Sequence, residues 1–170
     1  MVGQSHREHI TCEGYGPGGA AVLVDCCGTD RERTIDGLRE VFRNHGGQLG
    51  ASGSVAYLFT PVGRLAYRAG TPQQPLATVS IQSGAEDLVV NGDGSIEVLT
   101  DPRDLDAVRA ALAEAGMPPA LCELTRRPVA TLQISAAEGR QLQALVDALN
   151  GLDEVNSVWI NAATAGELRS

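Results

Sequence analysis

The chain has 170 residues, of which 43% are hydrophobic and 20% are charged, a balance typical of a globular protein with one large or two small domains. Its formal net charge is −8, so contact with nucleic acid would require a local basic patch. No apolar run approaches the roughly 18–20 residues of a membrane span, and the N-terminal segment lacks the apolar region of a signal peptide. We therefore expect a cytoplasmic protein that does not cross a membrane.

The cysteines contain no C-x-x-C pair, and in a reducing compartment they are expected to be small buried residues: Cys12, Cys26, Cys27 and Cys122. The spacing His6-x-x-His9-x-x-Cys12 resembles part of a metal site but lacks a fourth ligand nearby. We predict neither a metal site nor a bound cofactor.

A glycine-rich segment, Glu13–Asp25 (EGYGPGGAAVLVD), dominates the first part of the chain. Its glycines match the letters of the dinucleotide-binding fingerprint, G-x-G-x-x-G. That motif binds pyrophosphate only where the glycines open a helix, whereas here they open an apolar run typical of a buried strand. The pattern predicts a β-hairpin over residues 9–27, with the glycines in its connection.

A helix is predicted to begin at Asp30, which can cap its N-terminus, and to continue for about 15 residues. Its apolar residues recur on one face: Ile35, Leu38, Val41 and Phe42. The glycine pair Gly46-Gly47 is expected to end the helix in a left-handed conformation. Four arginines decorate the other faces: Arg31, Arg33, Arg39 and Arg43.

The middle of the chain alternates between strand and helix patterns. A strand is predicted at Ser54–Phe59, with a break at Pro61 and Gly63. The elements expected after the break are a strand at Arg64–Arg68, a helix over 72–83, a hairpin whose strands Glu86–Asn91 and Ser95–Leu99 flank Gly92-Asp93-Gly94, a helix capped by Asp101, and a strand at Leu121–Thr125.

The last part of the chain predicts a strand, a helix and a strand. Alternation over Val129–Ile134 indicates a strand whose inward residues are Leu132 and Ile134. The pair Ser135 and Glu138 forms a capping box, which begins a helix that ends at Gly151. Its apolar residues are Leu142, Leu145, Val146 and Leu149, and the final strand is expected at 155–160.

This order of elements favours an α+β fold built of two ferredoxin-like α/β sandwich domains, the second inserted into the first. The first domain would combine residues 9–61 and 128–162, the inserted domain would be 62–127, and residues 1–8 and 163–170 would be flexible tails. Three consecutive small domains are the alternative, but the first and last of them would be poorly buried.

Three sequence blocks resemble the YebC/PmpR family: Glu13–Asp25, His45–Phe59 (HGGQLGASGSVAYLF) and Asp93–Leu112 (DGSIEVLTDPRDLDAVRAAL). The arginine-containing segment Thr29–Thr34 (TDRERT) is also similar to the start of that family's first helix. The family comprises transcriptional regulators and a mitochondrial translational activator, so the resemblance implies contact with nucleic acid or the ribosome. The basic helical domain that usually precedes the glycine hairpin in this family has no counterpart in this sequence.

No arrangement of residues indicates catalysis, and we expect a protein that is not an enzyme. His45 could be drawn as a general base, but no nucleophile is near it in the sequence, and a histidine at a helix C-terminus is favourable on electrostatic grounds alone. Arginines suit phosphates, and glycine turns can present N–H groups to anions. The candidate nucleic-acid-binding residues are therefore Arg31, Arg33, Arg39, Arg43, Arg126 and Arg127, with Tyr15, Gly16, Gly18, Gly19, His45, Gly46 and Gly47 as loop or anion candidates.

The expected function is regulation of gene expression through nucleic acid or the ribosome. Tyr15 is the aromatic residue expected to be exposed, whereas Tyr57, Phe59 and Trp159 are expected in the core. The alternative is a protein-interaction or ligand-sensing module that pairs with itself or with a full-length relative, or that binds a small ligand between its domains.

Overall fold

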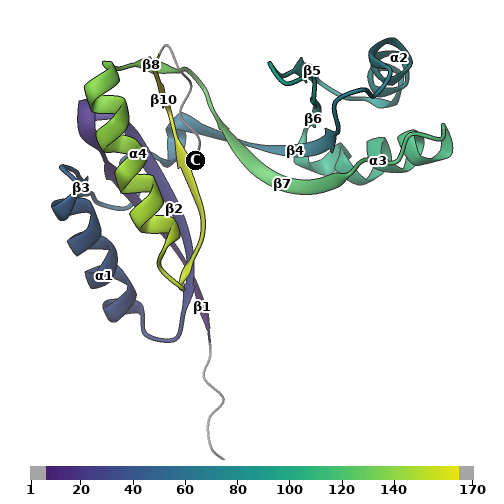
Figure 1. Cartoon of the computed structure of the whole chain (residues 1–170). Helices are drawn as coiled ribbons and strands as arrows, with labels where there is room; N and C mark the ends of the chain where they lie inside the picture. Colours follow the sequence, from purple (N-terminus) through teal and green to yellow (C-terminus); the bar gives the residue numbers. More distant parts are fainter. Residues whose placement is uncertain (1–6, 165–170) are drawn as a thin grey trace, which may run out of the picture. The chain divides into compact units, whose positions relative to one another are not determined.

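The computed structural model describes residues 7–164, and within it the chain divides into two compact units. The first unit consists of the described residues up to Thr60 together with those from Pro128 onward, and the second consists of Pro61–Arg127. Figure 1 shows the helices and strands of each unit.

The first unit is a four-stranded antiparallel sheet with two helices on one face (Figure 1). The predicted hairpin is confirmed as β1 (Glu8–Tyr15) and β2 (Ala21–Gly28), joined by the 3₁₀ turn Pro17–Gly19. The sheet order is β3-β1-β2-β9, in which β3 is Gln48–Leu49 and β9 is Val155–Ile160. The helices are α1 (Arg31–Asn44) and α4 (Ala136–Asn150), and β8 (Leu132–Gln133) pairs in parallel with β10 (Ala162–Ala163).

Alternate residues of the strands form the core beneath α1 and α4. Val22, Val24 and Cys26 of β2 point to this face, since side chains alternate along a strand. The predicted apolar face of α4 is confirmed, because Leu142, Leu145, Val146 and Leu149 are all buried. Its capping box is also confirmed, with Glu138 N–H donating to Ser135 Oγ at 3.1 Å and Ser135 N–H donating to Glu138 Oε1 at 3.0 Å.

The second unit has the strand order β5-β6-β4-β7 and the chain order βαββαβ, which is the ferredoxin-like arrangement. Its strands are β4 (Phe59–Tyr67), which begins in the first unit, β5 (Asp87–Val90), β6 (Ile96–Thr100) and β7 (Leu121–Pro128). Its helices are α2 (Gln73–Ser83) and α3 (Leu105–Glu114), the latter preceded by a 3₁₀ turn at Pro102–Asp104. The predicted helix over 72–83 is confirmed, and Pro75 stands in its first turn, where no N–H bond is lost.

The first unit has the same spatial strand order as the second, although its chain order differs. When β2, β3 and β9 are taken as the first, second and fourth ferredoxin strands, the third place is filled by β1, which comes from the start of the chain. Each helix then lies in its ferredoxin position, α1 after β2 and α4 before β9. Both units are therefore α+β sandwiches of the ferredoxin-like kind.

The predicted strand at Ser54–Phe59 is wrong. Residues up to Val55 form a loop, Ala56–Leu58 form a 3₁₀ turn, and the strand begins only at Phe59. The physical reason is that the N–H groups of Val55 and Ala56 donate to the Glu13 carboxylate rather than to a neighbouring strand. As a consequence Tyr57, expected in the core, is 73% exposed, whereas Phe59 is buried as predicted and Trp159 is partly buried.

The predicted break at Pro61 and Gly63 is also wrong, since β4 runs through both residues. The β4–β6 ladder begins with Gly63 opposite Thr100, so Pro61 precedes that ladder and no bond of the ladder requires its missing N–H. Farther along the chain, only Leu132–Gln133 of the predicted strand Val129–Ile134 is extended and paired. Leu132 is 38% exposed rather than inward, whereas Ile134 packs against the core.

The paired strands extend slightly beyond the predicted domain ends at 9 and 162, because β1 begins at Glu8 and β10 includes Ala163. The rest of the predicted flexible tails, residues 1–6 and 165–170, lies outside the described residues.

Candidate functional site

The candidate site is built around α1 of the first unit. Asp30 caps this helix, since its carboxylate accepts the backbone N–H of Arg33 at 3.2 Å, as the sequence predicts. The helix ends where Gly46 takes the left-handed conformation, with φ of 75°. The arginines of α1 are exposed, as residues outside the apolar face should be.

Two of the α1 arginines, Arg31 and Arg39, line one groove (about 220 Å³). They lie two helical turns apart on the same side of α1, with Ile35 between them. The opposite wall comes from β1, from β3 and from the loop that follows β3. We call this the arginine groove, and its residues are Thr11, Cys12, Glu13, Arg31, Ile35, Arg39, Leu49, Gly50 and Ser52.

Arg31 carries the free positive charge of this groove, because it forms no ion pair with a carboxylate among residues 7–164. Arg39 donates to Asp36 at 2.9 Å in an exposed i,i+3 pair. Such a surface pair contributes little stability, so Arg39 can exchange Asp36 for another anion at low cost. The hydroxyl-bearing residues Thr11 and Ser52 also line the groove and can supply neutral hydrogen bonds.

Arg33 and Arg43 do not line the arginine groove. Arg33 lies two residues from Arg31, on another side of the helix, and lines a different pocket with Leu152, Glu154 and Val155. Arg43 is exposed in the last turn of α1, where its charge is favourable next to the helix C-terminus. The four arginines that the sequence groups together are therefore divided by the helix between different surfaces.

Arg126 and Arg127 belong to the second unit, at the end of β7. The pKa of Glu97 is lowered in the folded chain. Burial opposes this shift, while the hydrogen bonds of Arg64 and Asn91 and the charges of Arg64 and Arg127 produce it. Both arginines are thus part of the second unit and outside the arginine groove.

Glu13 forms one wall of the arginine groove, and sequence reasoning did not single it out. It is only 5% exposed, and its carboxylate accepts three backbone N–H groups: Gly53 at 2.5 Å, Val55 at 2.8 Å and Ala56 at 2.6 Å. These bonds fix the loop that carries Ser52. The position of Glu13, between an apolar strand and glycines, could have indicated this role. A carboxylate that is buried at such a position needs hydrogen-bond donors of its own.

Three of the glycines proposed to bind anions, Gly16, Gly18 and Gly47, have close packing partners within the first unit, whereas Gly19 and Gly46 do not. A Cβ on Gly16 would stand 2.7 Å from Leu142 Cδ1, and a Cβ on Gly47 would stand 2.5 Å from the Tyr15 carbonyl oxygen. Their N–H groups are also engaged, Gly16 with Ala20 and Gly47 with Phe42. Gly18 and Gly19 are exposed in the turn, and Gly19 N–H donates to Gly16. The hairpin packing therefore accounts for Gly16 and Gly47 without a ligand.

Tyr15 is 41% exposed, close to what the sequence suggests, and its hydroxyl donates to the Ser54 carbonyl oxygen at 3.3 Å. His45 ends α1, and its Nδ1–H donates to the Val41 carbonyl oxygen at 2.9 Å. It lines a small pocket with Asn44, Gly46, Gln141 and Ala144, none of which is a nucleophile. This arrangement fits the helix-end interpretation of His45.

Cys12 lies against Cys26 in the core beneath the arginine groove. A hydrogen bond from Cys26 lowers the pKa of Cys12, burial opposes this, and the charge of Arg31 adds to the lowering. The same hydrogen bond, together with burial, raises the pKa of Cys26. All four cysteines are free thiols; Cys12 and Cys26 are buried as expected, whereas Cys27 is partly buried and Cys122 is exposed. Within residues 7–164 no cluster of metal-ligating side chains occurs, and no helix is long and apolar enough to span a bilayer.

Comparison with known proteins identifies the family. Residues 7–162 match the family model described as the second and third domain of TACO1/YebC. The chain belongs to this family. The expected resemblance to YebC/PmpR proteins is thereby confirmed, and the matched residues correspond to domains two and three.

Curated relatives carry the name probable transcriptional regulatory protein. One from Ralstonia nicotianae is 43% identical over 93% of this chain and 66% of its own length, and one from Halorhodospira halophila is 44% identical over 94% and 65%. The chain thus spans slightly less than two thirds of these relatives. The crystal structure of a conserved hypothetical protein, Aq1575 from Aquifex aeolicus, matches with a TM-score of 0.89 and 34% identity, over 100% of this chain and 70% of that one.

Proposed function

We propose that this chain is a non-enzymatic, cytoplasmic regulator of gene expression that binds the phosphate backbone of nucleic acid, free or within the ribosome, through the arginine groove. The observation that carries the proposal is that Arg31 and Arg39 converge on one groove with Thr11 and Ser52. Arginine forks and hydroxyls are the groups that proteins use against phosphate oxygens. The relatives' name supports the regulatory part of the proposal.

The charge distribution favours a small contact rather than a broad one. The chain carries −8 overall, and Asp30, Glu32, Asp36 and Glu40 accompany the four arginines of α1. None of these four acidic residues lines the arginine groove, and the Glu13 carboxylate in its wall accepts three backbone N–H groups, so a phosphate would meet the least acidic surroundings inside the groove. We therefore expect binding that involves few phosphates, with an affinity that depends weakly on salt compared with broad basic surfaces.

Titration of labelled single-stranded RNA, duplex DNA and purified ribosomes at two salt concentrations tests this function. Affinity for at least one of these targets should fall as salt rises, with a slope that corresponds to about one or two phosphate contacts. The absence of binding to all three by the folded chain would contradict the proposal.

Protein interaction is a second candidate, favoured by one feature of the second unit. The strand β7 is at the edge of its sheet, and it exposes Leu121 (47%) and Leu124 (67%). An edge strand with exposed leucines is suited to strand addition by a second copy or by a full-length relative. A monomeric mass at high micromolar concentration would argue against self-association through this edge.

A further inference from the structure

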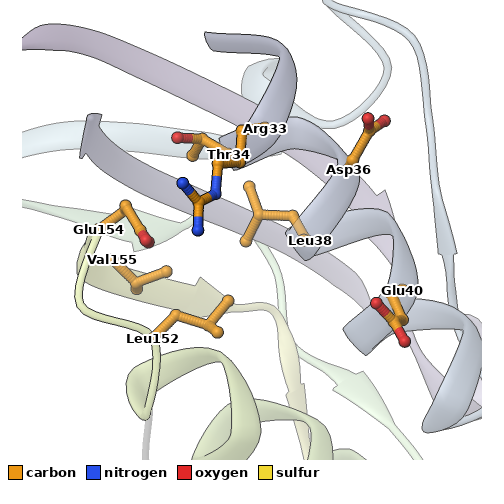
Figure 2. A pocket seen from close by; sticks show the side chains of 9 residues that line it. Arg33, Thr34, Asp36, Leu38, Glu40, Leu152, Glu154 and Val155 are labelled. Carbon is orange, nitrogen blue, oxygen red and sulfur yellow. The ribbon is translucent and has the colours of Figure 1, made fainter. Parts of the chain in front are cut away.

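A second pocket of the first unit (about 330 Å³) lies between α1 and the loop that joins α4 to β9. Figure 2 shows it, with α1 on one side and the residues Leu152, Glu154 and Val155 on the other. This volume is at the lower end of the range of small-molecule sites, about 300–1,000 Å³. Its residues are Arg33, Thr34, Asp36, Gly37, Leu38, Glu40, Leu152, Glu154 and Val155.

Two opposite charges line this pocket from different elements. Arg33 comes from the first turn of α1, and Glu154 comes from the loop before β9. In Figure 2 the Arg33 side chain extends from α1 toward Glu154. Neither forms an ion pair within residues 7–164, so a guanidinium and a carboxylate are available to one small ligand.

Apolar side chains complete the pocket beside these charges. Leu152 and Val155 are partly buried and offer apolar surface, and they pack on the core that contains the fully buried Leu38. Gly37 leaves space on the helix, since a Cβ added there would meet nothing within 4 Å. A ligand therefore finds a cation, an anion and an apolar surface together.

We propose that this pocket binds a free α-amino acid with a medium-sized apolar side chain, such as leucine. The ligand's carboxylate would pair with Arg33, its ammonium group with Glu154, and its side chain would lie against Leu152 and Val155. Arginine matches a carboxylate in a two-pronged geometry, and charge-assisted bonds are the stronger kind. This inference goes beyond the proposed function, because the pocket shares no residue with the arginine groove.

The remaining charges set the selectivity of the pocket. Asp36 and Glu40 also line it, so its rim carries three carboxylates against one guanidinium. A second carboxylate on the ligand would be repelled, which disfavours aspartate and glutamate. A ligand without the ammonium group would leave the Glu154 carboxylate unpaired and would add its own negative charge.

The test is an NMR titration of the 15N-labelled chain with leucine. The backbone amides of Gly37, Leu152 and Glu154 should shift and saturate, with a Kd on the order of 1 mM, as expected for a ligand of this size in an open site. N-acetyl-leucine, which lacks the ammonium charge, and leucinamide, which lacks the carboxylate, should each bind at least about tenfold more weakly.

Three variants locate the site. Arg33→Gln and Glu154→Gln each remove one charge, and Gly37→Met adds a side chain at a lining position where a Cβ meets nothing within 4 Å. Each should weaken leucine binding about tenfold or more, whereas Arg43→Gln, which removes an exposed arginine of the same helix outside the pocket, should not.

Three results would overturn the inference. One is the absence of saturable shifts at these amides with any of the apolar amino acids. The second is equal binding of leucine, N-acetyl-leucine and leucinamide, and the third is leucine binding that all three pocket variants leave unchanged. None of these results bears on nucleic-acid binding by the arginine groove, which is measured separately.

Discussion

Glu13 and Val55 are 42 residues apart in the chain, and the buried carboxylate Oε1 of Glu13 accepts the backbone N–H of Val55 at 2.8 Å. The same carboxylate accepts the N–H groups of Gly53 and Ala56. One side chain of β1 thereby binds three N–H groups of this segment, and it holds the loop that forms a wall of the arginine groove.

Glu13→Ala should destabilise the first unit, because three N–H groups lose their acceptor and at least the Val55 group is buried. We expect the free energy of unfolding to fall by about 2–4 kcal/mol. Urea unfolding followed by circular dichroism measures this change. Glu8→Ala removes an exposed glutamate from the same strand and should change stability by less than about 0.5 kcal/mol. Equal effects of the two substitutions would contradict the anchoring role of Glu13.

The Glu13 contact also explains why the sequence did not predict the structure of Ser54–Phe59. The hairpins, the capped helices and the apolar faces are local patterns, and residues such as Ser135, Glu138 and Leu142 predict them directly. The segment Ser54–Phe59 reads as a strand by the same local criteria, but a carboxylate some 40 residues earlier takes its N–H groups. A contact at that separation leaves no periodic trace in the sequence.

The candidate site was predictable to a similar degree. The sequence indicates that α1 carries arginines away from its apolar face, and the structure agrees. It does not indicate that Arg31 and Arg39 share a groove while Arg33 lines another pocket, because that division depends on what packs beside each side of α1. The glycines that follow Tyr15 and His45 in the sequence suggest an anion-binding loop. In the structure, Gly16 packs against Leu142 and Gly47 packs against Tyr15.

Gly16→Ala tests this packing role. The added methyl group would collide with Leu142 in the core, where space is fully used, so we expect a loss of about 1–3 kcal/mol in the free energy of unfolding. Gly37→Ala is the matched control, because its Cβ meets nothing within 4 Å and alanine favours a helix interior by about 1 kcal/mol. Thermal unfolding of both variants measures the difference. A neutral Gly16→Ala would mean that the hairpin is not closely packed on α4.

The lowered pKa of Glu97 indicates how the stability of the second unit responds to acid. Burial raises the pKa of this carboxyl, but hydrogen bonds from Arg64 (2.5 Å) and Asn91 (3.1 Å), with the charges of Arg64 and Arg127, outweigh burial and lower the pKa below its ordinary value of 4.5. A lowered folded-state pKa contributes stability above the ordinary value, and that contribution is lost as the pH falls through the folded-state pKa.

Glu97→Gln should therefore flatten the acid side of the stability curve. Urea unfolding at several pH values between about 3 and 7 should show a smaller loss in this variant than in the wild type, whereas Glu86→Gln, which changes an exposed glutamate, should follow the wild type. A Glu97→Gln curve as steep as the wild-type curve would show that another group governs the acid response.

Charge reversal at Arg31 and Arg39 tests whether the arginine groove binds nucleic-acid phosphate. Fluorescence anisotropy with the target that binds in the salt titration would compare the wild type, the double variant Arg31→Glu/Arg39→Glu and Arg140→Glu, a reversal of an exposed arginine on α4 outside the groove. We predict that the double variant loses at least about tenfold in affinity and most of its salt dependence, while Arg140→Glu stays close to the wild type. Unchanged binding by the folded double variant would contradict this prediction.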